Sequence, residues 1–103
     1  MKIIIKVVDL ISEELSGAKE YIKLAEQVAT EHPSLSECFA SLAEAEMGHV
    51  KRLHDEVEKI IAEVRSKDGE PSSAMLAVYD YEHTKQIEKA AKIKRMIEDY
   101  RNK

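Results

Sequence analysis

Two short elements of the same form occur along the chain, and each places a histidine three residues after a carboxylate. Glu46 and His49 make the first element, and Asp80 and His83 make the second. Side chains at positions i and i+3 of a helix share one face, so the two members of each pair can reach one metal ion. Carboxylate oxygens and imidazole nitrogens together suit iron or manganese. The spacing therefore predicts a metal site, if helices bring these residues together.

A further carboxylate, Glu14, lies in an unexpected position. It follows Leu10 by four residues and precedes Ala18 by four, inside an apolar helix face, whereas Glu13 lies off this face and is expected to be solvated. A buried carboxylate is costly unless a partner or a metal ion neutralises it. We therefore expect Glu14 to be a ligand as well. The alternative for each residue taken singly is a boundary carboxylate that reaches solvent or a satisfied core histidine, because helices rich in Glu and Lys place such residues near apolar faces by chance.

Hydrophobic periodicity predicts an all-α chain whose three helices would carry these residues, over about 8–31, 34–66 and 72–102. Pro33 favours an end to the first helix before it, and the turn cluster "SKDGEPSS" separates the second helix from the third. Ser34, with Glu37 three residues later, predicts a capping box at the start of the second helix. The three consecutive isoleucines of the opening "MKIIIKVV" could form a strand, but nothing else in the sequence offers a partner strand, so this segment is interpreted as an apolar arm or a helix extension.

The apolar faces of the expected helices include Leu10 in the first helix, Leu42 in the second and Ile87 in the third. Asp80 and His83 would interrupt the third face as Glu46 and His49 interrupt the second. His32 falls in the turn before the second helix and His54 lies beside the second apolar face. Both of these histidines are expected to be solvated.

The composition indicates what surrounds such a site. A length of 103 residues suits one domain spanning the whole chain, and 44% hydrophobic with 35% charged residues is typical of a folded helical protein. The net charge of −4 provides no basic surface for nucleic acid. The N-terminal segment "MKIIIKVVDLISEEL" is too short and too charged to span a membrane, and the single cysteine, Cys38, fits a reducing compartment. We therefore expect a cytoplasmic protein without nucleic-acid or membrane partners.

In these residues the chain resembles the ferritin-like proteins, which include the rubrerythrins and the bacterioferritins. That family builds a four-helix bundle in which two helices each contribute one Glu and the other two each contribute Glu-x-x-His. Glu14 followed seven residues later by Tyr21 resembles the first metal-binding helix of the family, and Glu46 with His49 resembles its Glu-x-x-His. The stretches "EELSGAKEYIKLAE" and "AEAEMGHVKRLH" thus look like the first ferritin hairpin, over about residues 8–66.

The resemblance implies a pair of iron ions, or manganese, and a ferroxidase or peroxidase type of reaction in iron handling or oxidative-stress defence. It implies that Glu46 bridges the ions, that Glu14 and His49 are terminal ligands, and that Tyr21 hydrogen-bonds a carboxylate. No rubredoxin-like cysteine pair accompanies these residues, so we expect no electron delivery by a fused centre of that kind. The alternative function is a non-catalytic helical assembly module that kept the scaffold and lost the metal. Asp80, which stands where the family has Glu, favours that alternative.

The chain departs from the family in its second half, because only one helix follows the hairpin. Two assemblies would complete the metal site. In the first, the three helices of one chain form it, with the residues Glu14, Glu46, His49, Asp80 and His83. In the second, two chains pair their hairpins into a four-helix bundle, as the short encapsulated ferritins do, and share two copies of Glu14, Glu46 and His49. The closer family match of the hairpin favours the second assembly. A homodimer or larger homo-oligomer is expected from both.

Overall fold

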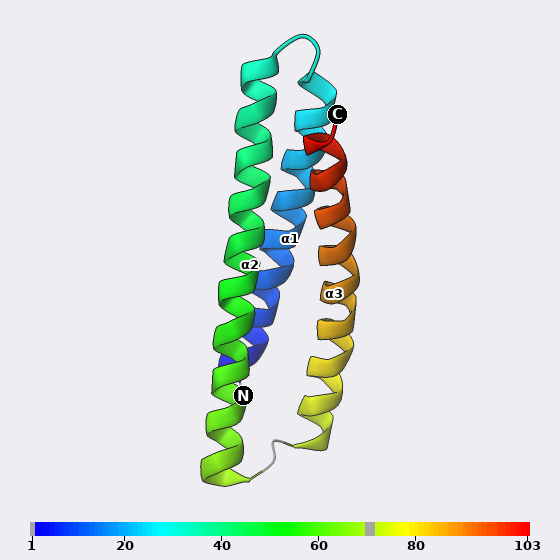
Figure 1. Cartoon of the computed structure of the whole chain (residues 1–103). Coiled ribbons are helices and arrows are strands. Elements are labelled where there is room, and N and C mark those ends of the chain that lie inside the picture. Colours follow the sequence, from blue (N-terminus) through cyan, green and yellow to red (C-terminus); the bar gives the residue numbers. More distant parts are fainter. Residues whose placement is uncertain (1, 70–71) are drawn as a thin grey trace.

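The computed structural model describes residues 2–69 and 72–103, and it contains three long helices. They are α1 (Lys2–Val28), α2 (Pro33–Asp68) and α3 (Ser73–Arg101). α1 and α2 form an antiparallel hairpin, and α3 runs back along it in the same direction as α1 (Figure 1). The result is a rod with extents of 56 × 20 × 18 Å. The prediction of an all-helical chain with three helices is confirmed.

The helix ends differ from the predicted ones at several points. α1 begins at Lys2, so of the two interpretations of the N-terminal segment the helix extension is confirmed, with Met1 outside the described residues. α2 begins at Pro33, one residue before the predicted cap. The capping box at Ser34 and Glu37 is therefore wrong, because proline, with its fixed φ and missing N–H, already occupies the first helical turn. Residues 70–71 of the predicted linker lie outside the described residues.

The core follows a heptad pattern, in which buried positions alternate in steps of four and three residues. In α1 these positions are Ile4, Val8, Ile11, Leu15, Ala18, Ile22 and Ala25. This is the spacing of helices that pack side by side along their length. The stripe begins at Ile4, which explains why the N-terminal segment is helical: its apolar residues continue the same buried face.

Three residues predicted in the core are exposed, because the buried faces are rotated relative to the predicted ones. Leu10, Leu42 and Ile87 have exposed fractions of 38%, 39% and 55%. Asp80 is exposed as well, whereas His54, predicted to be solvated, is half-buried. Packed long helices follow a 3.5-residue period, so a stripe assigned on the 3.6-residue period of a free helix drifts off the true seam.

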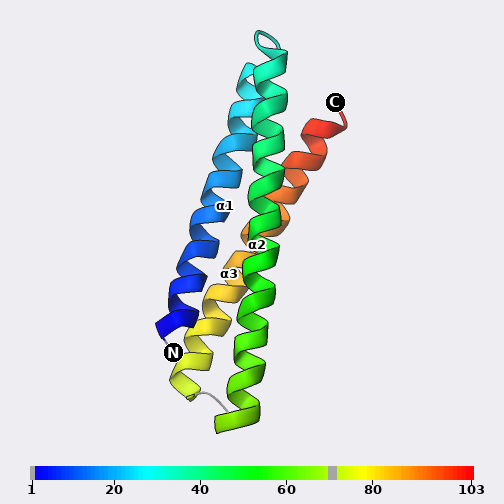
Figure 2. The same cartoon turned by 90° about the vertical axis from the view of Figure 1, so that its left-hand side faces the viewer.

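α3 lies across the hairpin and packs chiefly against α1 (Figure 2). Its buried Gln86 donates a hydrogen bond of 2.9 Å to the carbonyl of Val8 and one of 3.0 Å to the hydroxyl of Ser12. Near its end, the Tyr100 hydroxyl lies 2.6 Å from the buried Ser36 hydroxyl of α2. These contacts hold α3 on one side of the hairpin and leave the other side uncovered. Within the described residues, no helix has the length and apolarity needed to cross a membrane.

Candidate metal centre

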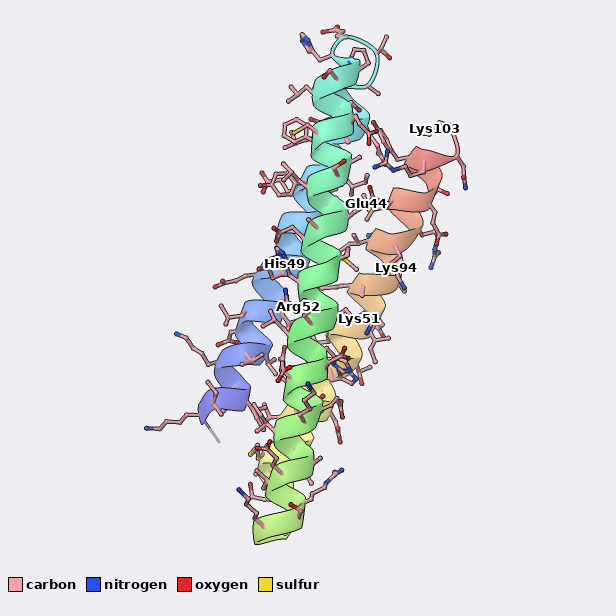
Figure 3. All side chains as sticks on the ribbon, turned by 60° about the vertical axis from the view of Figure 1, so that its left-hand side comes forward. Glu44, His49, Lys51, Arg52, Lys94 and Lys103 are labelled. Atoms are coloured by element: carbon pink, nitrogen blue, oxygen red, sulfur yellow. The ribbon has the colours of Figure 1, made fainter. Side chains whose placement is uncertain are left out.

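Three of the predicted ligands meet on the uncovered side of the α1–α2 hairpin. Glu14 comes from α1, and Glu46 and His49 come from α2; one donor atom from each lies within 4.8 Å of the others. The Nδ1 atom of His49 is 3.3 Å from Oε2 of Glu14 and 3.9 Å from Oε1 of Glu46. Figure 3 shows His49 on the side of α2 that faces α1. The hairpin alone therefore gathers two carboxylates and an imidazole.

These side chains lie beside the buried seam rather than in it, which leaves them partly accessible. The side chains of Glu14 and Glu46 are 28% and 24% exposed, and that of His49 is 52% exposed. Gly17 contributes room around them, since a Cβ at this position would lie 3.4 Å from Oε2 of Glu46. A larger residue there would fill the space beside the carboxylate.

The two carboxylates repel each other, and this repulsion shows in the acidity of Glu46. A side-chain hydrogen bond with Glu14 is the largest cause that raises the pKa of Glu46; partial burial and the negative charge of Glu14 raise it further, and the nearby His49 opposes the effect. A divalent cation bound between the two carboxylates would remove this repulsion. The donors are two oxygen ligands and one nitrogen ligand, a set that fits iron or manganese.

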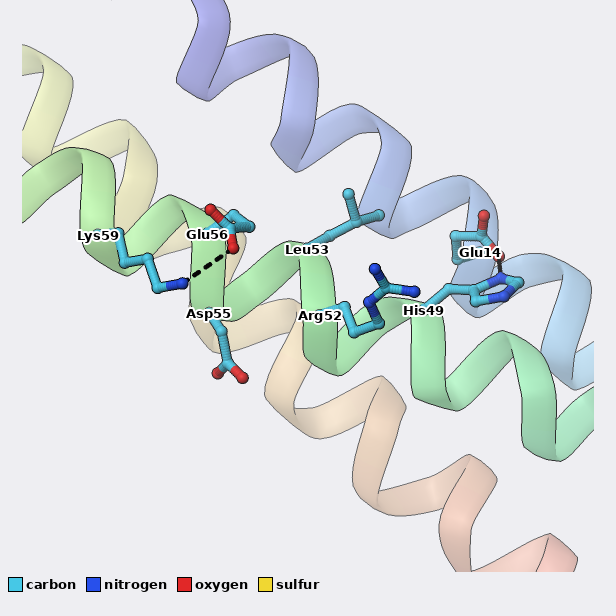
Figure 4. Close-up of a pocket in the computed structure, with 7 residues that line it drawn as sticks. All are labelled: Glu14, His49, Arg52, Leu53, Asp55, Glu56 and Lys59. Carbon is cyan, nitrogen blue, oxygen red and sulfur yellow. Dashed lines mark hydrogen bonds and ion pairs between the residues drawn. The ribbon is translucent and has the colours of Figure 1, made fainter.

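An open hollow of about 410 Å³ adjoins these residues (Figure 4). Glu14 and His49 lie at one end of it, and Arg52 and Leu53 continue its wall along α2. At the other end Lys59 pairs with Glu56 at 3.0 Å. The ligand atoms are therefore reachable from outside the chain, either by a small molecule or by a second copy of the hairpin.

Tyr21, predicted to orient a carboxylate, lies two turns after Glu14 on α1 and is half-buried. Its ring stacks on that of Phe39, with the ring centroids 6.1 Å apart. Its hydrogen bond to a ligand carboxylate stays a prediction.

The structure does not bring Asp80 and His83 to this centre. Asp80 is exposed and belongs to neither of the two groups of metal-ligand side chains found among the described residues. His83 lies instead with His54 and Glu58 of α2. A cage of all five predicted ligands within one chain is therefore absent from the described structure. The cause is the rotation of α3, which turns Asp80 outward.

Sequence reasoning missed the group formed by His54, Glu58 and His83. The signal was present, since His54 and Glu58 are four residues apart on one helix and thus share a face. Such pairs are frequent in helices rich in Glu, so spacing alone did not distinguish this one.

Comparison with known protein families gives one match. A family model described as Rubrerythrin matches residues 8–102, which covers all of α2 and α3 and all of α1 except its first six residues, 2–7. No curated protein and no solved structure matches the chain.

Proposed function

Because this chain belongs to the rubrerythrin family, we propose that it binds a pair of iron ions, or manganese in their place, through Glu14, Glu46 and His49. Membership makes it a ferritin-like metal-binding protein. The observation that carries the specific site is the close approach of two partly buried carboxylates and an imidazole, with its mutual repulsion of like charges. Bound iron would supply the Fe(II)/Fe(III) couple. We assign the protein to oxidation of Fe(II) by O₂ or peroxide, in iron handling or oxidative-stress defence.

The residues of the site have distinct tasks in this proposal. The family pattern makes Glu46 the ligand that the two ions would share, and the absence of a side chain at Gly17 leaves room beside its carboxylate. Glu14 and the neutral imidazole of His49 serve as terminal ligands. Tyr21 orients a carboxylate, as ligand partners in the surrounding layer do in metalloproteins generally.

A single hairpin supplies too few donors for two ions, and the surface around the site indicates where the others come from. Leu10 lies one turn before Glu14, and Leu42 lies one turn before Glu46, and both leucines are exposed beside their ligands. Exposed apolar residues that share a face with half-buried ligands are typical of an interface. We infer that a second chain covers this face, completing a four-helix bundle with a second set of ligands, while α3 stays outside.

A metal-free assembly role is the less favoured function. It would leave Glu14 and Glu46 together without a cation to offset their repulsion. The presence of Asp80 where the family has Glu no longer favours the metal-free role. Asp80 is exposed and takes no part in the proposed site, so this difference does not weaken metal binding there.

The test is a titration of metal-free protein with Mn(II), and with Fe(II) under anaerobic conditions, followed by calorimetry. We expect about one ion per chain or more, with a rise in thermal stability by mass action. The double variant Glu46→Ala, His49→Ala should lose this binding. Asp80→Ala is the matched control and should keep it, because Asp80 is an exposed carboxylate outside the group. If the wild type takes up neither metal, the proposal is wrong.

A further inference from the structure

A second group of metal-ligand side chains lies between α2 and α3, apart from the proposed iron site. His54 and Glu58 are one turn apart on α2, and His83 faces them from α3; one donor atom from each lies within 4.8 Å of the others. We propose that these three residues bind a divalent ion of the Zn²⁺ class, which ties α3 to α2. The inference does not depend on the iron site.

The donor set distinguishes this group from the iron site. It offers two imidazole nitrogens and one carboxylate oxygen, whereas the iron site offers one imidazole and two carboxylates. Imidazole-rich sets favour zinc and neighbouring metals such as cobalt and nickel over manganese, calcium and magnesium. The two groups should therefore differ in which metal they prefer, and this difference can be measured.

Each of the three ligands is already positioned by a neighbour. The hydroxyl of Tyr79 donates a 2.9 Å hydrogen bond to Oε1 of Glu58, and the Nε2 atom of His54 is 3.6 Å from the same oxygen. The ring of His83 stacks between those of His54 and Tyr79, with centroid distances of 4.7 and 5.4 Å. Such supporting bonds orient ligands in metal sites.

Binding requires a small closing movement. Donor atoms at the usual ~2.0–2.1 Å from Zn²⁺ stand roughly 3.4 Å apart in a tetrahedral site, so donor atoms that now lie within 4.8 Å of one another must approach. The stacked rings of His54 and His83 must also turn so that a nitrogen of each points at the same ion. Two features allow this movement. The side chain of His54 is 34% exposed and that of Glu58 is 53% exposed. α3 also packs lightly against α2, so the ring of His83 can shift without disturbing the core.

A groove gives an ion access to the two histidines of this group. It has a volume of about 570 Å³, and His54 and His83 lie in its wall together with apolar residues such as Met47 and Ile87. The three protein ligands leave one tetrahedral position, and the groove has room for the water molecule that would fill it.

The experiment uses the double variant Glu46→Ala, His49→Ala, in which the iron site is disabled, so that only the second group is titrated. Co²⁺ is added first, because its visible absorption reports a bound nitrogen ligand field, and Zn²⁺ is then used to displace it. We expect about one ion per chain and a higher melting temperature with Zn²⁺. Adding His54→Gln or His83→Gln should weaken binding by more than about 100-fold, and Tyr79→Phe by about tenfold.

His32→Gln is the matched control, because His32 is an exposed histidine in the α1–α2 turn, far along the chain from the group. If it weakens binding as much as His83→Gln does, the ion is held adventitiously by surface histidines and the proposal is wrong. Unchanged affinity in the His54 and His83 variants also overturns it. Circular dichroism confirms that each variant is folded, and Tyr79→Phe serves if a histidine variant is not. If the wild type does not bind iron at all, the Zn²⁺ and Co²⁺ titrations of this second group remain a valid test.

Discussion

At the scale of single residues, Glu46 has opposite effects on the metal-free and the metal-bound protein. Its carboxylate faces that of Glu14, and the raised pKa of Glu46 shows that its charge is disfavoured there. We predict that Glu46→Gln stabilises the metal-free protein at neutral pH by about 0.5–1 kcal/mol, the usual range for one close charge pair. The same variant should lose the stabilisation that Mn(II) gives the wild type. Thermal unfolding with chelator and with Mn(II) measures both effects.

Glu13→Gln is the control for this prediction, because Glu13 is an exposed carboxylate one residue from the site. It should change stability by less than about 0.5 kcal/mol with and without metal. A Glu46→Gln variant that is less stable than the wild type in chelator would show that the carboxylate is structural rather than a ligand.

The convergence of Glu14, Glu46 and His49 could be predicted from the sequence, and the second group could not, for a physical reason. Glu14, Glu46 and His49 lie on a two-helix hairpin, and a short turn restricts how two antiparallel helices can face each other. The ligand role of these residues stays a prediction, but their convergence was predictable. His83 belongs to a third helix, whose rotation depends on which residues pack against the hairpin. That rotation turned His83 toward His54 and Asp80 toward solvent.

At the scale of the elements, Arg101 fastens the end of α3 to the start of α2 by pairing with Glu37 and Glu44. The hydrogen bond from Arg101 is the largest cause that lowers the pKa of Glu37. A carboxyl group whose pKa is lower in the folded state adds stability above its ordinary pKa, and this is lost as the pH falls through the lowered value. Arg101→Gln should therefore destabilise the protein at neutral pH, and the difference should vanish in acid.

Urea unfolding of the wild type and Arg101→Gln, from about pH 7 down to about pH 3, measures this difference. Lys103→Gln is the control, because it removes a positive charge from the same exposed end. An equal gap between wild type and Arg101→Gln at every pH would contradict the prediction, since the loss would then come from packing rather than from Glu37.

Gln86 is the polar residue that fixes the middle of α3 against α1. It is only 7% exposed, and its amide bonds the Val8 carbonyl and the Ser12 hydroxyl. We predict that Gln86→Ala lowers the free energy of unfolding by about 1–3 kcal/mol, because buried polar contacts and packing are both lost. Urea unfolding at neutral pH measures the loss. The apolar periodicity could not identify this residue, since a buried glutamine differs from a solvated one only in its partners.

At the scale of the whole molecule, the number and order of the helices could be predicted from the sequence, because turn residues and apolar periodicity are local signals. The rotation of each helix could not, as Leu10, Leu42 and Ile87 show. Their exposure depends on the seam that three helices share. For the two leucines of the hairpin, the displacement has a functional consequence: it leaves them on the face that also carries Glu14 and Glu46.

The face of the hairpin that carries Leu10 and Leu42 beside the proposed ligands supports the prediction of a dimer. Leu42→Glu places a charge among the exposed apolar residues one turn from Glu46, so it should shift a dimer to monomer. Light scattering at micromolar concentration measures the change. Val78→Glu is the control, because Val78 is an apolar residue of α3, 56% exposed, and α3 would lie outside the bundle. It should leave the dimer intact. A wild type that is monomeric at this concentration would contradict the shared bundle.

Metal binding then separates a shared site from a site within one chain. If two hairpins share the site, the monomeric Leu42→Glu variant should bind Mn(II) more weakly by about tenfold or more, although its own Glu14, Glu46 and His49 are unchanged. The double variant Asp80→Ala, His83→Ala should keep its Mn(II) affinity, because neither residue reaches the iron site. Glu14→Ala should destroy that affinity. A monomeric variant that still binds two ions as tightly as the wild type would place the whole site within one chain.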